Sequence, residues 1–208
     1  TLNSMREFVL KIIKEDNFLS LAGNLVLATL GFAGFALLAR GLDTDSFAKW
    51  VLFISGGSLV EMLRFGITNN ALIRFLSGAH TDTKEQLIGS NVLISFIVTV
   101  IIALILIGCN HFFHANIQNS GYSLFFKWYP VLVFFNLPWN NALIVLQAKM
   151  EYGKILLIKA INSGVFFLIL ILNAIVLNLA VTQLVLLLIL VNLITSLVCV
   201  FKNWDGLK

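Results

Sequence analysis

Hydrophobic residues occur in long runs separated by short polar stretches, and these runs determine which elements the sequence predicts. A transmembrane helix needs about 20 consecutive, mostly apolar residues. Six segments meet this requirement, and they cover residues 18–38, 47–76, 87–107, 122–147, 155–177 and 182–201. We therefore predict an all-α integral membrane protein whose residues 18–201 form a bundle of six transmembrane helices.

Three of these segments have features that shape the predicted bundle. Glu61 and Arg64 interrupt the second segment, which we expect to bend at Gly66 and continue to its end. The fourth contains Pro130 and Pro138, and proline kinks a helix because it removes a backbone hydrogen bond. The third has almost no polar face, so we expect it to contact lipid.

Short segments at the two ends of the chain complete the predicted organisation. In residues 1–17, apolar residues recur at helical spacing between charged ones. This pattern predicts an amphipathic helix that lies in the cytoplasmic membrane interface. Residues 202–208 are expected to form a cytoplasmic tail.

The composition excludes several classes of protein. The chain has 208 residues, of which 59% are hydrophobic and 12% are charged. Average soluble domains are about 45–50% apolar and about 25% charged. A soluble enzyme, a disordered chain and a nucleic-acid-binding domain are therefore all poor fits.

The basic residues predict how the bundle is oriented. Eleven of the 14 Lys and Arg residues fall in the N-terminal stretch, the regions around the second and fourth connections, and the C-terminal tail. The other three, Arg40, Lys49 and Lys127, fall on the opposite side. Because Lys and Arg accumulate in cytoplasmic loops, this division places both termini in the cytoplasm.

Glu61 and Arg64 are the first candidate site residues. They are three residues apart in the second segment, so they share one helix face. An ionisable side chain at mid-bilayer costs about 2.5–3.5 kcal/mol, and therefore needs a partner or a water-filled cavity. Either the two charges form an ion pair that only orients the helix, or they line a cavity; we favour the cavity.

Other polar residues extend the candidate set. Asn24 lies on the first segment and Lys159 on the fifth, while Arg40 and Arg74 lie near segment ends. Amide and hydroxyl residues also recur on the later segments: Asn136, Asn140, Gln147, Asn162, Ser163, Asn173, Asn192, Thr195 and Ser196. Such residues commonly hold membrane helices together, and their recurrence suggests a shared hydrated interior. The predicted cavity-lining set is Glu61, Arg64, Arg74, Arg40, Asn24 and Lys159.

Enzymatic chemistry finds little support in the sequence. All three histidines, His80, His111 and His114, are predicted in loops, and there is no HExxH motif or cysteine–histidine cluster. His111 and His114 could share a helix turn, but two histidines without a third ligand are weak evidence for a metal. We predict no catalytic residues, no metal and no cofactor.

The first two segments carry motifs of a known family. The stretch LLARGL at residues 37–42, Phe47 and Trp50, LRFG at 63–66 and ALIRF at 71–75 resembles the start of bacterial polysaccharide flippases. These are the O-antigen and lipid-linked oligosaccharide exporters of the multidrug/oligosaccharidyl-lipid/polysaccharide superfamily. The Tyr152-Gly153 element and the six-helix layout also fit. Here FAKW at residues 47–50 replaces the family's usual Phe-Gly.

The resemblance implies a function and a larger assembly. Family members typically have two six-helix lobes around a central cavity, so this chain would supply the N-terminal lobe, with the second lobe missing from it. The substrate would be a polyprenyl-diphosphate-linked oligosaccharide, moved across the bacterial inner membrane by alternating access. Cationic residues would attract the diphosphate, and acidic residues would respond to a coupling ion.

Three alternatives remain open from the sequence. A cation-coupled multidrug antiporter of the same superfamily would use Glu61 as its cation site. A membrane-embedded enzyme acting on polyprenyl-phosphate sugars would need clustered acidic residues at a membrane face, and a non-transporting assembly subunit would need none. The closest acidic pair, Asp43 and Asp45, has no nearby base or metal partner in the sequence.

Overall fold

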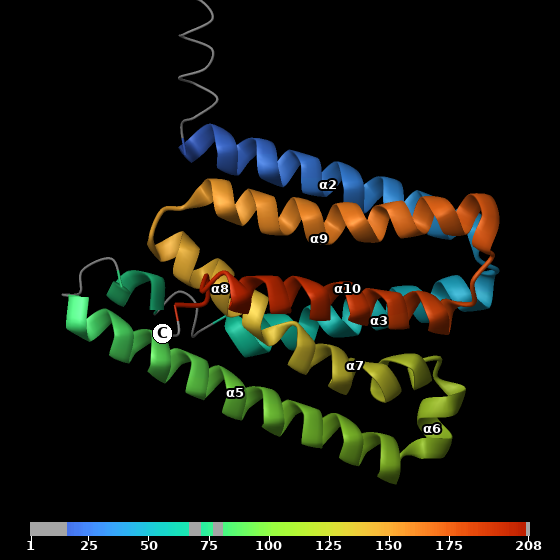
Figure 1. The fold of residues 1–208 in the computed structure, drawn as a ribbon. Helices are drawn as coiled ribbons and strands as arrows, with labels where there is room; N and C mark the ends of the chain where they lie inside the picture. Colours follow the sequence, from blue (N-terminus) through green and yellow to red (C-terminus); the bar gives the residue numbers. More distant parts are fainter. Residues whose placement is uncertain (1–15, 67–71, 77–80, 207–208) are drawn as a thin grey trace, which may run out of the picture.

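Helices form all the regular structure in the part of the chain that the computed structural model describes, which is residues 16–66, 72–76 and 81–206. The predicted all-α fold is confirmed. Figure 1 shows the helices, whose bounds are α2 (Asp16–Gly41), α3 (Thr44–Phe65), α5 (Thr81–Phe112), α6 (His114–Asn119), α7 (Ser123–Phe135), α8 (Leu137–Ala148), α9 (Tyr152–Leu172), the π-helix η1 (Asn173–Leu177) and α10 (Val181–Phe201).

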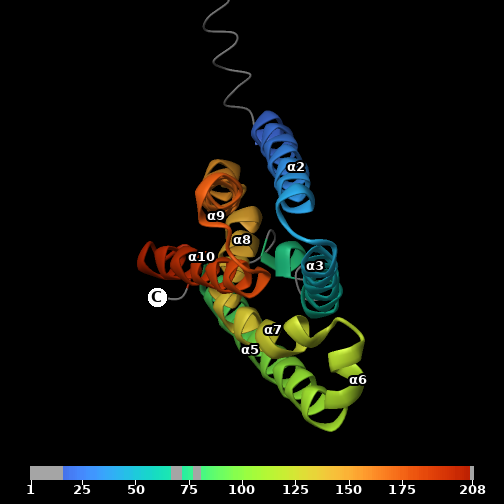
Figure 2. The same cartoon turned by 90° about the vertical axis from the view of Figure 1, so that its right-hand side faces the viewer.

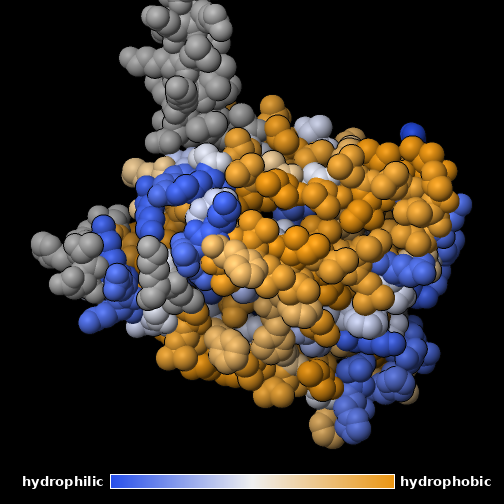
Figure 3. Space-filling view, viewed as in Figure 1, coloured by the Kyte–Doolittle hydropathy of each residue, from blue (hydrophilic) through white to orange (hydrophobic). Residues whose placement is uncertain are grey.

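The helices have the length and composition of membrane spans. Within the described residues, five of them are long and apolar enough to cross a bilayer, and α7 with α8 makes a sixth if the bent pair is one span. Figure 3 shows an apolar band across the middle of one face of the molecule, with hydrophilic residues gathered at both ends. The protein is therefore a multi-pass membrane protein.

Three helices form the centre of the bundle, and others pack at its two edges. The side chains of α3, α7 and α10 form most of the main core, around Phe53, Tyr129 and Leu184. At one edge α2 packs mainly along α9, and at the opposite edge α5 packs along α7 (Figures 1 and 2). Successive spans run in opposite directions. The α2–α3 connection and α6 thus lie at one end of the bundle, and the α8–α9 turn lies at the other (Figure 1).

The fourth predicted segment is divided at Asn136. The axes of α7 and α8 differ by 48° across this residue. Pro138 stands in the first turn of α8, where its missing backbone N–H cannot donate the hydrogen bond that would continue α7 through Asn136. Pro130 lies inside α7 without ending it. The bend places the side chain of Asn136 in the interior, where it is 6% exposed.

The third predicted segment, α5, has two different sides. Large apolar side chains such as Leu93, Ile97 and Leu104 are exposed along it, which suits contact with lipid. Asn91, Ser95 and Thr99 are buried at four-residue spacing. The third segment therefore has a polar face that was not predicted, on the side of α5 that packs into the bundle.

Several predicted boundaries fall at the limits of the described chain. Most of the amphipathic helix predicted for residues 1–17 lies outside the described residues, and α2 already includes residues 16 and 17. The segment that would carry the predicted helix on past Gly66, residues 67–71, also lies outside them. α3 ends at Phe65, and residues 72–76 form a separate helical segment.

The ends of two helices are fixed by local contacts. Asp43 caps α3: its Oδ1 accepts a hydrogen bond from the Ser46 amide at 3.0 Å, which holds the pKa of this carboxyl below its usual value. After α10, the Trp204 amide donates to the carbonyl of Cys199 at 3.0 Å, and Asp205 is buried. The described part of the predicted tail, residues 202–206, therefore folds against the bundle.

Candidate functional site

The charged pair of α3 is joined to the junction of α7 and α8. Arg64 Nη1 donates to Glu61 Oε1 at 3.0 Å and to Asn136 Oδ1 at 2.9 Å. The Asn136 amide nitrogen donates to the same Glu61 oxygen at 2.8 Å. The residue at the helix break thus bridges both charges, with its carbonyl toward the cation and its amide toward the carboxylate.

A tyrosine of α7 completes this network. The Tyr129 hydroxyl lies 2.8 Å from Glu61 Oε1 and 3.0 Å from the carbonyl oxygen of Gly57. It has one proton, so it donates to one of these acceptors at a time. The ring comes this close because residue 57 is glycine: a Cβ there would lie 2.6 Å from Tyr129 Cε2. Phe125 stacks on the Tyr129 ring, with centroids 4.9 Å apart.

The two charges differ in burial. The Arg64 side chain has no exposed surface, and its guanidinium lies 4.3 Å from the centre of the Phe65 ring. The Glu61 side chain is 28% exposed. Its Oε1 atom lies within hydrogen-bonding distance of three donors, from Arg64, Tyr129 and Asn136, and no described donor reaches Oε2. Arg64 is therefore enclosed in the protein, and Glu61 is held by one oxygen at the edge of the network.

Glu61 borders an open hollow of about 520 Å³. Its lining residues come from α3 and from the start of α8, and they are Glu61, Met62, Phe65, Gly66, Asn136, Trp139 and Asn140. A carboxylate, two amides and an aromatic ring therefore meet beside the helix break. This group offers acceptors and donors at the surface of an otherwise apolar span.

Comparison with protein families identifies the chain. A family model described as "Polysaccharide biosynthesis protein" matches residues 13–208. The chain belongs to this polysaccharide biosynthesis family. The family resemblance inferred from the motifs of the first two segments is confirmed. The family is generally transporter-like rather than catalytic, and membership supports a role in polysaccharide synthesis or export. No curated protein and no solved structure matched the chain.

The predicted site residues of this family member fall into separate groups. Glu61 and Arg64 are brought together in the network described above. Asn24 and Lys159 line a second hollow, of about 170 Å³, between α2 and α9. Arg40 is exposed in the last turn of α2, at the opposite end of the bundle from the α8–α9 turn.

Arg74 lies apart from both hollows. It is exposed in the segment of residues 72–76 and is not among the residues that line either one. Within the described chain, the six residues predicted as one cavity-lining set thus line two different hollows or neither.

Two residues of the network were missed or undervalued by sequence reasoning. Asn136 was recognised only as part of a polar stripe suited to helix packing, and Tyr129 was not singled out. The two are seven residues apart, about two turns, and so share a helix face. A polar face through the aromatic run of α7 was the available signal.

Metal-binding groups are absent from the described residues: no three His, Cys, Asp or Glu side chains gather there. His111 and His114 are exposed near the junction of α5 and α6, and His80 lies outside the described residues. What the Glu61 site offers is a charged, hydrogen-bonding surface within a membrane span.

Proposed function

We propose that this protein exports a polyprenyl-diphosphate-linked oligosaccharide across the cytoplasmic membrane by alternating access, for the synthesis of a cell-surface polysaccharide. Family membership supports the polysaccharide part of this proposal. The observation that carries the transport part is a carboxylate, Glu61, that is anchored inside a membrane span and borders an open hollow. Charged groups inside spans are costly, and commonly mark transport pathways.

Glu61 and Arg64 take different roles in this proposal. Glu61 borders the hollow and keeps 28% of its side chain exposed, which is the surface it offers to a sugar hydroxyl or a coupling cation. Its oxygen without a described donor, Oε2, is buried, so a ligand reaches that atom only after the surrounding side chains shift. Arg64 is fully buried and holds the Glu61 carboxylate in one orientation. Asn140 and Trp139 extend the polar lining, and provide further contacts for a hydroxyl-rich ligand.

The hollow is open on one side, which fits a cavity completed by another part of the transporter. Repeat-built transporters bind their substrates near the membrane midplane, where the repeats meet. A second six-helix lobe facing α3 and α8 would close the hollow over Glu61. The broken span at Asn136 has the form expected near such a site, because discontinuous helices often form transporter binding sites.

A double substitution separates transport from structure. Glu61→Gln combined with Arg64→Gln removes both charges at similar volume, and so leaves no uncompensated ion. If the carboxylate serves transport, this variant is inserted at the normal level but fails to export. Export is measured as surface polysaccharide in a strain that lacks the native gene, alongside the amount of protein in the membrane.

The matched control lies on the same helix. Asp45 and Lys49 form an ion pair at the opposite end of α3, so Asp45→Asn with Lys49→Gln also removes one pair of charges. This control is expected to export normally. A Glu61/Arg64 double variant that is well inserted and exports like the control would refute a transport role for the pair.

A further inference from the structure

A second polar group lies on the contact between α2 and α9, and no acidic side chain of the described residues forms an ion pair with it. Lys159, Asn24, Gln147 and Tyr152 line the hollow of about 170 Å³. The ion pairs found in the described part of the chain join Lys49 to Asp45, Arg64 to Glu61, and Lys154 to Glu151, and none includes Lys159. The lining contains no carboxylate. This hollow therefore suits an anion.

The depth of Lys159 matches the region of lipid phosphates. Lys159 lies seven residues after Tyr152, the first residue of α9, so its Cα is about 10 Å from that end of the helix. A lysine side chain at this depth reaches outward to the interface while its methylene groups stay among apolar neighbours. The amides of Asn24 and Gln147 and the Tyr152 hydroxyl can donate further hydrogen bonds to a phosphate oxygen.

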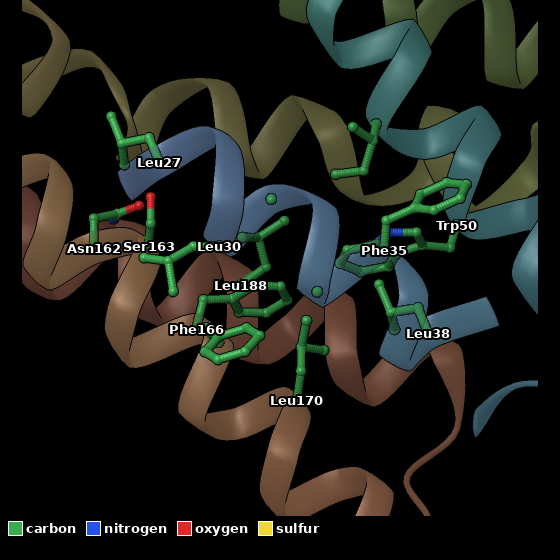
Figure 4. A pocket seen from close by; sticks show the side chains of 14 residues that line it. Leu27, Leu30, Phe35, Leu38, Trp50, Asn162, Ser163, Phe166, Leu170 and Leu188 are labelled. Carbon is green, nitrogen blue, oxygen red and sulfur yellow. The ribbon is translucent and has the colours of Figure 1, made fainter. Parts of the chain in front are cut away.

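An apolar hollow of about 280 Å³ continues along the same two helices. Leu27 lines both hollows. In Figure 4, Asn162 and Ser163 lie at the Leu27 end of the apolar hollow, and Phe35, Trp50 and Leu38 lie at its other end. Polarity therefore decreases along the contact between α2 and α9, from Lys159 through the amide and hydroxyl groups to the aromatic residues.

The apolar hollow also has a side open to the surroundings. Phe35 and Ile54, which line it from α2 and α3, keep 50% and 42% of their surface exposed. Gly31 adds to this opening, because a Cβ at that position would meet no atom within 4 Å. A flexible chain can therefore enter from the membrane between α2 and α3.

We propose that these joined hollows bind an anionic phospholipid, with its phosphate at Lys159 and one acyl chain along α2 and α9. From Leu27 to Leu38 the apolar hollow extends about 16 Å along α2. This is about half of the roughly 30 Å hydrocarbon thickness, which is the reach of an acyl chain within its own leaflet. A long polyprenyl chain would exceed it, so the occupant is a resident membrane lipid. The leaflet is the one beside the α8–α9 turn, and the proposal does not depend on the proposed function.

The test is photo-crosslinking with a lipid probe that reacts with the residues around it. The full-length protein is placed in phosphatidylcholine nanodiscs that contain phosphatidylglycerol with a photoreactive group on one acyl chain, and labelled peptides are mapped by mass spectrometry. Label is expected on the segments of α2 and α9 that line the apolar hollow. A phosphatidylcholine probe with the same chain should label them about fivefold less, because it carries no net charge to pair with Lys159.

Substitutions test each half of the site separately. Lys159→Gln should lower phosphatidylglycerol labelling about fivefold, to the phosphatidylcholine level, and Lys159→Arg should retain it. Gly31→Leu should fill the apolar hollow and remove the label from both probes. Gly108→Leu, on α5, is the matched control, because a Cβ at Gly108 also meets nothing within 4 Å.

Three results would overturn the proposal: equal labelling by the two probes, labelling unchanged by Lys159→Gln, or displacement by a polyprenyl phosphate at lower concentration than by unlabelled phosphatidylglycerol. The last would assign the site to the transported lipid. The Glu61→Gln, Arg64→Gln double variant should label normally. A failure of the export proposal therefore remains distinct from a failure of this one.

Discussion

The polar groups around Glu61 and around Lys159, both on described membrane-spanning helices, differ in how the protein satisfies them. At Glu61, side chains from α3, α7 and the helix break supply three hydrogen bonds to one carboxylate oxygen. At Lys159, four polar side chains line a hollow, and no carboxylate lies among them. The first group has a fixed geometry, and the second has a charge that the lining residues do not neutralise.

This difference implies that the Glu61 network contributes mainly to the stability of the bundle, and that Lys159 contributes mainly to binding. A network whose members satisfy one another is stabilised when it is complete, and is strongly affected when one member is lost. A charge that faces a hollow without a partner contributes little to the fold, and its removal affects mainly what binds there. Removing the charge should therefore lower stability strongly at Glu61 and very little at Lys159.

The largest expected effect tests the membrane topology, on which the depth assigned to Lys159 depends. Single cysteines at Asn116 and at Lys149, with Cys109 and Cys199 replaced by Ala, should react with a membrane-impermeant reagent from opposite sides of the membrane. Asn116 lies in α6, and Lys149 lies between α8 and α9. We expect Asn116 to face the periplasm and Lys149 the cytoplasm. Labelling from the same side would contradict the six-span topology.

The next effect distinguishes a complete network from a broken one. Glu61→Gln alone leaves the buried Arg64 charge without its carboxylate, and should lower the free energy of unfolding by on the order of 3 kcal/mol. Adding Arg64→Gln should recover most of this loss, because no unpaired charge remains. Denaturant unfolding in detergent measures both. A double variant that is no more stable than the single one would show that charge pairing is not the stabilising contribution.

A smaller effect is expected from adding a methyl group at two glycines, one packed against a neighbouring side chain and one with open space around it. Gly57→Ala places a methyl group 2.6 Å from the buried Tyr129 ring, and should cost about 1–3 kcal/mol of stability through overpacking. Gly31→Ala meets no atom within 4 Å, and should stabilise α2 by about 0.5–1 kcal/mol, because alanine loses less entropy in a helix. Thermal unfolding of the two variants should shift in opposite directions. Equal shifts would contradict the close packing of Tyr129 on α3.

The smallest effect is expected at Lys159. Lys159→Met retains the apolar stem and removes the charge, so the free energy of unfolding in neutral detergent should change by less than about 0.5 kcal/mol. The measurement is the same denaturant titration used for the Glu61 variants. A loss as large as that of Glu61→Gln would mean that Lys159 has a structural partner, and the contrast between the two sites would not hold.

The sequence predicts the helices well because the length of an apolar run reflects a physical requirement, the thickness of the bilayer. It also predicts that Glu61 and Arg64 lie on one helix face, because they are three residues apart, although it favoured a cavity-lining role over an ion pair. Asn24 and Lys159 were assigned to the same cavity as this pair. Helix spacing gives no information on which face of α2 meets which face of α9, so the division into two hollows could not be inferred.

The partners of Glu61 from outside α3 depend on contacts that no local pattern encodes. Tyr129 and Asn136 are 68 and 75 residues away along the chain. Their approach depends on how α7 packs against α3, and on the 48° bend that turns Asn136 inward. The buried stripe of Ser95 and Thr99 on α5 was missed for a related reason, since small polar residues in an aliphatic run hardly lower its average hydrophobicity.

The contact between Gly57 and Tyr129 also constrains how this part of the family evolves. A Cβ at position 57 would lie 2.6 Å from Tyr129 Cε2, so a side chain there fits beside the tyrosine only if the ring or the helix shifts. A relative that replaces the glycine avoids this cost by also replacing the tyrosine with a smaller residue, and Glu61 then loses one of its three donors. The three positions are expected to change together over evolutionary time, as one inherited unit.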